Sequence, residues 1–186
     1  SKPVINEVSD ILRLPIYSID NNAFLLDGFD PLRKQCDATK ILNKLDIFRQ
    51  KHSKLFKPDN IDNNTYYKYN YVYEKVLLVT HTDIYEQLSD FVFGLASQSL
   101  GVATVSIFRL NNEYYNYNPN DSDLIDRVVK ISTHEIGHLF GLGHCDHSDC
   151  IMYCSHSIGE LDSIHKQFCD ECRAQLDLNL KNNYQM

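Results

Sequence analysis

Apolar residues recur along the chain at two spacings, and together these predict a protein that mixes helices with strands. Helical spacing is clear between residues 37 and 50, where the apolar positions would form one face of an amphipathic helix. Asp37 is the expected N-cap, because its side chain can accept hydrogen bonds from the first free backbone N–H groups. The core positions of this helix are predicted to be Ile41, Leu42, Leu45 and Phe48.

Strand-like runs follow in the middle of the chain. The continuous apolar run at residues 75–80 is bounded by polar residues, which is typical of a central buried strand. Residues 91–94 and 102–110 predict two further strands, with a loop of small residues between them. Residues 113–117 are expected to pair back onto residues 102–110 across a turn at 111–112.

Two other segments carry weaker patterns. Residues 15–17, Pro-Ile-Tyr, are expected to form a short first strand. Residues 58–73 are rich in Asn and Tyr and predict a surface insertion, with a binding platform made by the tyrosines as the alternative.

A long helix is predicted from residue 123 to residue 140. Asp121 or Ser122 is expected to cap its start. The apolar positions that hold helical spacing along it are Ile125, Val128, Val129, Ile136 and Leu139. Whatever chemistry the end of this helix carries would be held on a rigid element.

Composition limits the classes of partner. The 186 residues suit one domain with a sizeable core, and the net charge of −7 argues against a nucleic-acid partner, whose phosphates would be repelled. No apolar run approaches the roughly 20 residues that span a bilayer. No secretory signal is visible, although the chain starts at Ser1 rather than Met.

Residues 134–144 have the pattern H-E-x-x-H-x-x-G-x-x-H. On a helix, His134 and His138 lie on one face about a turn apart, so their imidazoles can bind one Zn²⁺. Gly141 allows the backbone to leave the helix in a left-handed conformation, which makes His144 available as a third ligand. The fourth position stays open for water, as in catalytic zinc sites. An ordinary helix that carries histidines is the simpler alternative, but this extended pattern rarely arises by chance.

Glu135 is offset from the ligand face, so it can reach a water molecule on the zinc without binding the metal. Zinc lowers the pKa of such a water to around 7. Glu135 would take the proton and then carry it to the leaving amine of a cleaved peptide bond. These roles predict a zinc-dependent peptidase whose partner is a peptide or protein substrate.

Two other functions stay open: a zinc-binding scaffold with little turnover, and a hydrolase that acts on a non-peptide amide. Glu135 argues against the scaffold, because a degenerate site commonly loses its base while it retains its metal ligands.

The six cysteines allow two interpretations, paired disulfides or a second metal site. Cys154 could compete as a ligand, and Cys36 is expected to be an inert, partly buried thiol. A zinc–thiolate site fits a reducing compartment, which favours a cytoplasmic location. The four whose C-x4-C and C-x-x-C spacing suits a structural, tetrahedral zinc are Cys145, Cys150, Cys169 and Cys172.

The histidine motif, followed by C-x4-C-x-M and a downstream C-x-x-C, resembles the archaemetzincin family of metzincin-type metallopeptidases. Sixteen residues separate Met152 from Cys169, one fewer than in the family pattern, as a one-residue loop deletion would produce. Residues 77–110 also resemble the family's core, and weak similarity extends over most of the chain.

This resemblance implies an α/β (α+β) fold with a twisted mixed sheet, a backing helix and a long active-site helix. It implies one catalytic domain, with an N-terminal lobe at residues 1–141 and a small zinc-containing C-terminal lobe at 142–186. Substrate would lie extended along an edge strand near residues 91–99. Met152 would pack beneath the metal site in a Met-turn, and the chain would hold two zinc ions.

Several further side chains near the motif have weaker claims. Tyr153, next to Met152, is a candidate second donor to the oxyanion. Glu160 and Asp162 could orient a zinc histidine, although cap or surface roles are expected. His147, His156 and His165 are expected to be solvent-exposed. His52 and His81 have no partner pattern and are expected to be structural.

Overall fold

The computed structural model describes residues 2–16, 18, 28–52 and 75–184. The Asn- and Tyr-rich segment at 58–73 lies outside these residues, as do Tyr17 and the side chain of His52. Among the described residues no helix is long and apolar enough to cross a membrane.

Strands form two small sheets, of which one supports the site. That sheet has the order β3-β6-β5, made of β3 (Val76–Thr80), β6 (Val102–Ser106) and β5 (Gly94–Ser97). β6 runs parallel to β3 and antiparallel to β5, so the sheet is mixed. The second sheet has the order β1-β2-β4, made of β1 (Phe29–Asp30), β2 (Gln35–Asp37) and β4 (Ile84–Tyr85).

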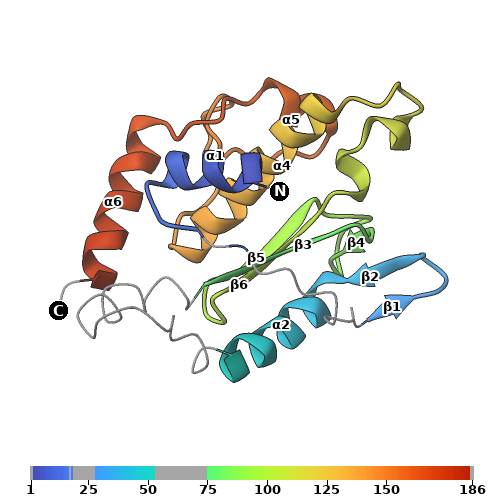
Figure 1. Cartoon of the computed structure of the whole chain (residues 1–186), viewed down its shortest axis with the longest axis horizontal. Helices are drawn as coiled ribbons and strands as arrows, with labels where there is room; N and C mark the ends of the chain where they lie inside the picture. The colour runs from blue at the N-terminus through green and yellow to red at the C-terminus, as the bar shows by residue number, and fades with distance from the viewer. Residues whose placement is uncertain (1, 17, 19–27, 53–74, 185–186) are drawn as a thin grey trace.

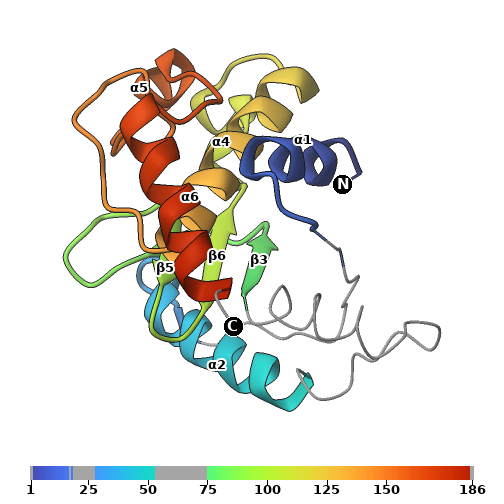
Figure 2. The ribbon, with the colours of Figure 1, turned by 90° about the vertical axis from the view of Figure 1, so that its left-hand side faces the viewer.

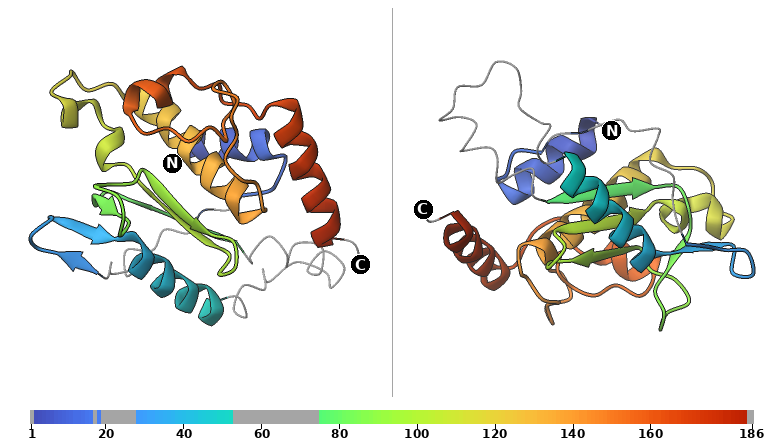
Figure 3. Two further views of the ribbon diagram at one scale, coloured as in Figure 1. Left: turned by 180° about the vertical axis from the view of Figure 1, so that it is seen from behind. Right: turned by 90° about the horizontal axis from the view of Figure 1, so that it is seen from below.

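Helices cover both faces of the β3-β6-β5 sheet. Figures 1 and 3 show α2 (Ala38–His52) on one face, with α4 (Asp121–Leu139) and α1 (Lys2–Leu12) on the other. Two further helices follow α4, namely the short α5 (Ile158–Ser163) and the longer α6 (Asp170–Tyr184). α6 passes the C-terminal end of α4 (Figure 2), where the Asn179 side chain donates a hydrogen bond of 2.8 Å to the Phe140 carbonyl.

The central strand β6 is buried on both faces, and its alternating side chains connect the two layers of helix. Val102 packs with Leu42 and Leu45 of α2, whereas Val105 packs with Val128 and Ile131 of α4. The sheet is therefore enclosed between α2 and α4, which confirms the predicted mixed α/β class with a backing helix and a long helix opposite.

α2 confirms the sequence prediction closely. The Asp37 carboxylate accepts hydrogen bonds from the backbone N–H groups of Thr39 (2.9 Å) and Lys40 (3.2 Å), as an N-cap does. The predicted core positions Ile41, Leu42 and Leu45 are buried, and Phe48 packs against the same cluster.

The start of α4 was placed two residues too late and its cap was assigned wrongly. The N-cap is Asn120, whose backbone is extended and whose side-chain oxygen accepts hydrogen bonds from the N–H groups of Ser122 (3.0 Å) and Asp123 (3.4 Å). Asp121 and Ser122, the predicted caps, are already helical. Asp121 and Asp123 lie in the first turn, where negative charge stabilises the helix dipole.

Strand predictions were less accurate. β3 is an edge of its described sheet rather than a central strand, and residues 91–93 precede β5 instead of belonging to a strand. β6 ends at Ser106, after which the chain forms two 3-10 turns, η2 (Phe108–Leu110) and η3 (Asn112–Tyr115). The pairing predicted for residues 113–117 is therefore wrong.

Local asparagine chemistry explains these turns. The Asn111 side chain donates to the Ile107 carbonyl (2.7 Å), and Asn116 adopts a left-handed conformation (φ 62°) that ends η3.

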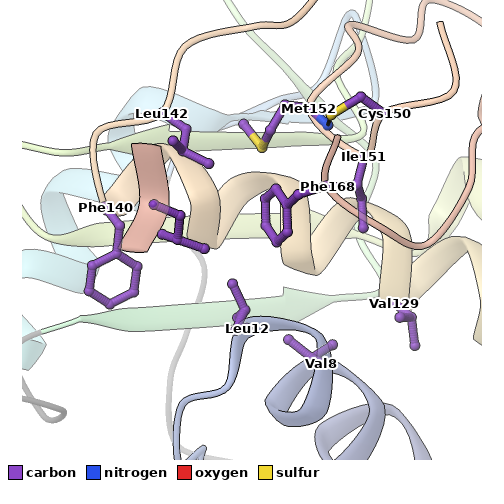
Figure 4. Close-up of a cluster of buried hydrophobic side chains, with 10 residues drawn as sticks. Val8, Leu12, Val129, Phe140, Leu142, Cys150, Ile151, Met152 and Phe168 are labelled. Atoms are coloured by element: carbon purple, nitrogen blue, oxygen red, sulfur yellow. Dashed lines mark hydrogen bonds between the residues drawn. The ribbon is translucent and has the colours of Figure 1, made fainter. Parts of the chain in front are cut away.

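The N-terminal region is helical where only apolar clusters and a strand were predicted. Pro15 and Ile16 are not in a strand, and residues 2–12 form α1. α1 buries Val8 and Leu12 in a cluster with residues from the end of α4 and the segment after it (Figure 4). The other buried members are Val129, Phe140, Leu142, Cys150, Ile151, Met152, Phe168 and Leu176. Long-range packing therefore stabilises this helix.

Replacing the observed cap of α4 provides a test of this fold. We expect Asn120→Ala to lower the free energy of unfolding by about 1 kcal/mol, because two backbone N–H groups lose their acceptor. Asn118→Ala is the matched control, since the Asn118 side chain caps no helix. Thermal unfolding measures both variants, and equal melting temperatures for them would contradict the cap assignment.

Candidate active site

Three histidine rings meet at the C-terminal end of α4. His134 and His138 come from the last two turns of the helix, and His144 follows the turn at Gly141. The ring nitrogens that could bind a metal all lie within 4.8 Å of one another, and the Nε2 atoms of His134 and His138 are 3.0 Å apart.

Backbone carbonyls orient two of the rings. The Nδ1 atom of His134 is 2.8 Å from the Ile151 carbonyl oxygen, and the Nδ1 atom of His138 is 2.8 Å from the Leu142 carbonyl oxygen. A carbonyl oxygen can only accept, so each Nδ1 carries the proton and each Nε2 keeps a free lone pair. Both lone pairs are thus available to one metal ion.

The donor set fits zinc. Two nitrogens at 2.0–2.1 Å from a tetrahedral zinc lie about 3.3 Å apart, close to the observed separation. Burial, together with the neighbouring His138, lowers the pKa of His134 to about 4. Burial, with His138 and His156, also lowers the pKa of His144. These rings are therefore neutral near pH 7, which is the form that binds metals.

A left-handed residue produces the turn that brings in the third histidine. Gly141 has φ +84°, its N–H donates to the His138 carbonyl (3.0 Å), and the Leu142 N–H donates to the Gly137 carbonyl (3.1 Å). This pattern is that of a glycine-terminated helix end.

Glu135 lies in the same cleft, against strand β5. Its side chain is buried, and burial raises its pKa to about 8. A cation on the neighbouring histidines would favour the ionised form. A Cβ atom placed on Gly94 would lie only 2.6 Å from the Glu135 Oε1 atom, so the carboxyl group is in direct contact with the strand.

Met152 is fully buried. A Cβ atom on Gly137 would lie 2.6 Å from the Met152 sulfur, which shows how closely the methionine packs against α4. The Met152 carbonyl accepts a hydrogen bond from the Cys145 N–H (2.9 Å). Met152 therefore has a packing role next to α4.

Four cysteine sulfurs form a second cluster, and none of them is in a disulfide. They all lie within 4.8 Å of one another, and the Sγ atoms of Cys145 and Cys169 are 3.8 Å apart. Sulfurs bound at 2.3 Å to a tetrahedral zinc have a separation of about 3.8 Å. Backbone N–H groups of Met152 (3.5 Å) and Cys169 (3.3 Å) donate to the Cys150 sulfur, which suits a thiolate. This set, completed by Cys172, fits a closed structural zinc site.

The other two cysteines lie elsewhere. Cys154 lines the histidine cleft rather than joining the four-sulfur cluster. Cys36 is buried beside Ala38, Ile41 and Ile84.

The cleft above the histidines has a volume of about 690 Å³. One wall is β5 with the residues before it, and β5 is an edge of its described sheet, as expected for the region 91–99. The other wall comes from residues 151–164, including Tyr153 and His156. An extended chain could thus lie along a strand edge and pass over Glu135.

His156 is solvent-exposed, as expected, and it also lines the cleft. Its backbone N–H donates to the Glu160 carboxylate (2.7 Å), and the Ser157 hydroxyl accepts from the Glu160 N–H (3.2 Å). The S-x-x-E pattern of Ser157 and Glu160 is the sequence signal for the start of α5. Asp162, by contrast, pairs with Arg127 (2.7 Å), so neither carboxylate contacts a zinc histidine.

The other histidines whose side chains are described do not line the cleft. His147 and His165 are exposed and approach Glu171 (3.7 Å) and Asp149 (3.9 Å). His81, which was expected to be structural, is exposed as well.

Three histidines converge at the end of α4, beside a buried carboxyl group, and four cysteines form a separate cluster. These features define a class of protein with a three-histidine site, which leaves a zinc position open for water, and a closed four-cysteine site. The model of the family described as Peptidase family M54 matches residues 29–178, and the chain belongs to this family. This membership confirms the family resemblance inferred from the motif.

Curated relatives agree. Residues of this chain are 44% identical over 103 residues to the archaemetzincin of Thermococcus kodakarensis, covering 55% of each chain. The archaemetzincin of Pyrococcus horikoshii is 38% identical over 120 residues, covering 64% of each. The chain thus matches less than two thirds of the length of these relatives.

Solved structures match over more of the chain. A zinc-dependent peptidase from Methanocorpusculum labreanum is similar with 55% identity and a TM-score of 0.85, covering 95% of this chain and 92% of that one. The archaemetzincin of Methanopyrus kandleri is similar with 30% identity and a TM-score of 0.73, covering 97% and 85%.

The cysteine cluster can be tested by removing one sulfur. We expect Cys172→Ser to lose one zinc equivalent and to lower the free energy of unfolding by about 3 kcal/mol or more, because a structural metal contributes directly to folding. Cys154→Ser is the matched control and should keep the metal content of the unchanged protein. Elemental analysis and thermal unfolding report both effects, and full zinc content in Cys172→Ser would contradict the assignment.

Proposed function

We propose that this protein is a zinc-dependent peptidase that hydrolyses peptide bonds with Glu135 as general base and acid. The observation that carries the proposal is the convergence of two carbonyl-oriented Nε2 atoms beside a buried carboxyl group, in a cleft bounded by a strand edge. Family membership supports the same chemistry.

The zinc ligands follow from the donor sets. His134, His138 and His144 would hold the catalytic zinc, and the four clustered cysteines would hold a structural one. The catalytic zinc, when bound, supplies a Lewis acid that makes water acidic and polarises the carbonyl under attack. The structural zinc would have no open position, so it would bind no substrate.

Glu135 supplies the proton transfers. Its carboxylate accepts a proton from the attacking water and then delivers that proton to the nitrogen of the departing amine. Burial of the side chain favours the protonated form, and a nearby cation favours the ionised form, so the carboxyl group can serve in both steps.

Strand β5 would bind the substrate backbone. It pairs with β6 on one side, and its other edge faces the cleft, so an extended peptide can add to the sheet there. Main-chain hydrogen bonds would supply affinity that is independent of side chains. The proposed substrate is accordingly an extended segment of peptide or protein.

We place the division between an N-terminal lobe and a small C-terminal lobe at Gly141, where α4 ends and the second wall of the cleft begins. We also place the protein in the cytoplasm, because four free cysteines suited to zinc fit a reducing compartment.

The proposal is tested with the general base. We expect Glu135→Gln to keep both zinc ions and the melting temperature, because the substitution is nearly isosteric, while kcat for a mixed peptide library falls by roughly 10²–10⁴-fold. Glu160→Gln, on the α5 cap, is the matched control and should retain most of the activity.

Product ends identified by mass spectrometry would separate exopeptidase from endopeptidase cleavage. Cleavage that persists in Glu135→Gln would come from another catalyst. No cleavage by the unchanged, zinc-loaded protein would instead favour a scaffold.

A further inference from the structure

Gly94, the first residue of β5, faces Glu135 across the contact between the strand and α4. A Cβ atom at this position would lie 2.6 Å from Oε1, 2.7 Å from Cγ and 2.8 Å from Cδ of Glu135. Cβ atoms in proteins essentially never approach other heavy atoms below 3.0 Å. The backbone at Gly94 is not in the left-handed region, so space rather than conformation requires a glycine.

The register of the sheet explains why this position points at the helix. Gly94 pairs with Val105 and Ala96 pairs with Ala103, and Val105 packs on α4. Leu95, between them, packs with the α2 side of the sheet. The positions of the edge strand that face α4 therefore carry only small residues, and the helix lies close to the strand.

The Glu135 side chain has little else to hold it. Among the described residues, no side chain or backbone group forms a hydrogen bond with its carboxyl group. The helix cannot retreat, because Gly137 on its opposite side packs against the Met152 sulfur. The steric wall at Gly94 is therefore what limits where the carboxyl group can lie.

We infer that Gly94 is a positioning residue for Glu135. Its missing side chain gives the carboxyl group a place between α4 and β5, directly beside the strand edge on which the peptide would lie. This inference rests on the proposed function, and it adds a specific requirement: any side chain at position 94 displaces the general base.

Activity measurements provide the first test. We expect Gly94→Ala to keep both zinc ions but to lower kcat for a cleaved peptide by about 10²-fold, with KM changed much less, because a displaced base impairs the chemical step. Gly159→Ala is the matched control, since a Cβ at Gly159 meets no atom within 4 Å. A kcat for Gly94→Ala equal to that of the control would overturn the inference.

A double-mutant cycle tests the contact without using activity. Gly94→Ala should lower the melting temperature by about 5 °C in the unchanged protein, through overpacking. In a Glu135→Ala background the added methyl group has room, so the same substitution should lower the melting temperature by less than about 1 °C. An equal fall in both backgrounds would show that Gly94 acts on the fold alone.

The two measurements separate this inference from the proposed function. If the zinc-loaded protein cleaves no peptide, the function fails, while the cycle still decides whether positions 94 and 135 are coupled. If Gly94→Ala alone does not fold, the double variant must fold and bind both zinc ions. Failure of the double variant to do so would contradict the inference.

Discussion

Close packing of α4 between strand β5 and the segment after residue 150 is the constraint on which the site depends. Gly94 contacts Glu135 on the strand side, and Gly137 contacts the Met152 sulfur on the other. These two contacts together fix the position of α4 relative to the strand and to Met152. The Ile151 and Leu142 carbonyls can then set the orientation of the two helical histidines, so that ligand geometry is established before metal binds.

The two metal clusters are connected through the chain itself. Cys145 directly follows His144, and Cys150 directly precedes Ile151, whose carbonyl orients His134. A closed four-sulfur site would hold the short segment between these cysteines, and with it both the third ligand and the orienting carbonyl. The structural zinc would therefore support the catalytic geometry although it contacts no substrate.

The two clusters of candidate ligands could be predicted from short sequence spacings: His134 and His138 are one helical turn apart, and each pair of cysteines is closely spaced. α2 was predictable for the same reason, since Asp37 is a typical N-cap residue directly before the helical pattern begins. The helix α1 was missed because its stability comes from packing against the distant segment around Met152. The contact of Gly94 with Glu135 joins residues far apart in sequence, so no local pattern could reveal it.

Anomalous diffraction at the zinc edge, on crystals of protein purified without chelator, tests this account most directly. The account predicts two zinc peaks: one about 2.1 Å from the Nε2 atoms of His134 and His138, with His144 as third ligand, and one about 2.3 Å from four cysteine sulfurs. A single peak would contradict the two-site arrangement. Coordination of His134 or His138 through Nδ1 would contradict the claim that backbone carbonyls orient the rings.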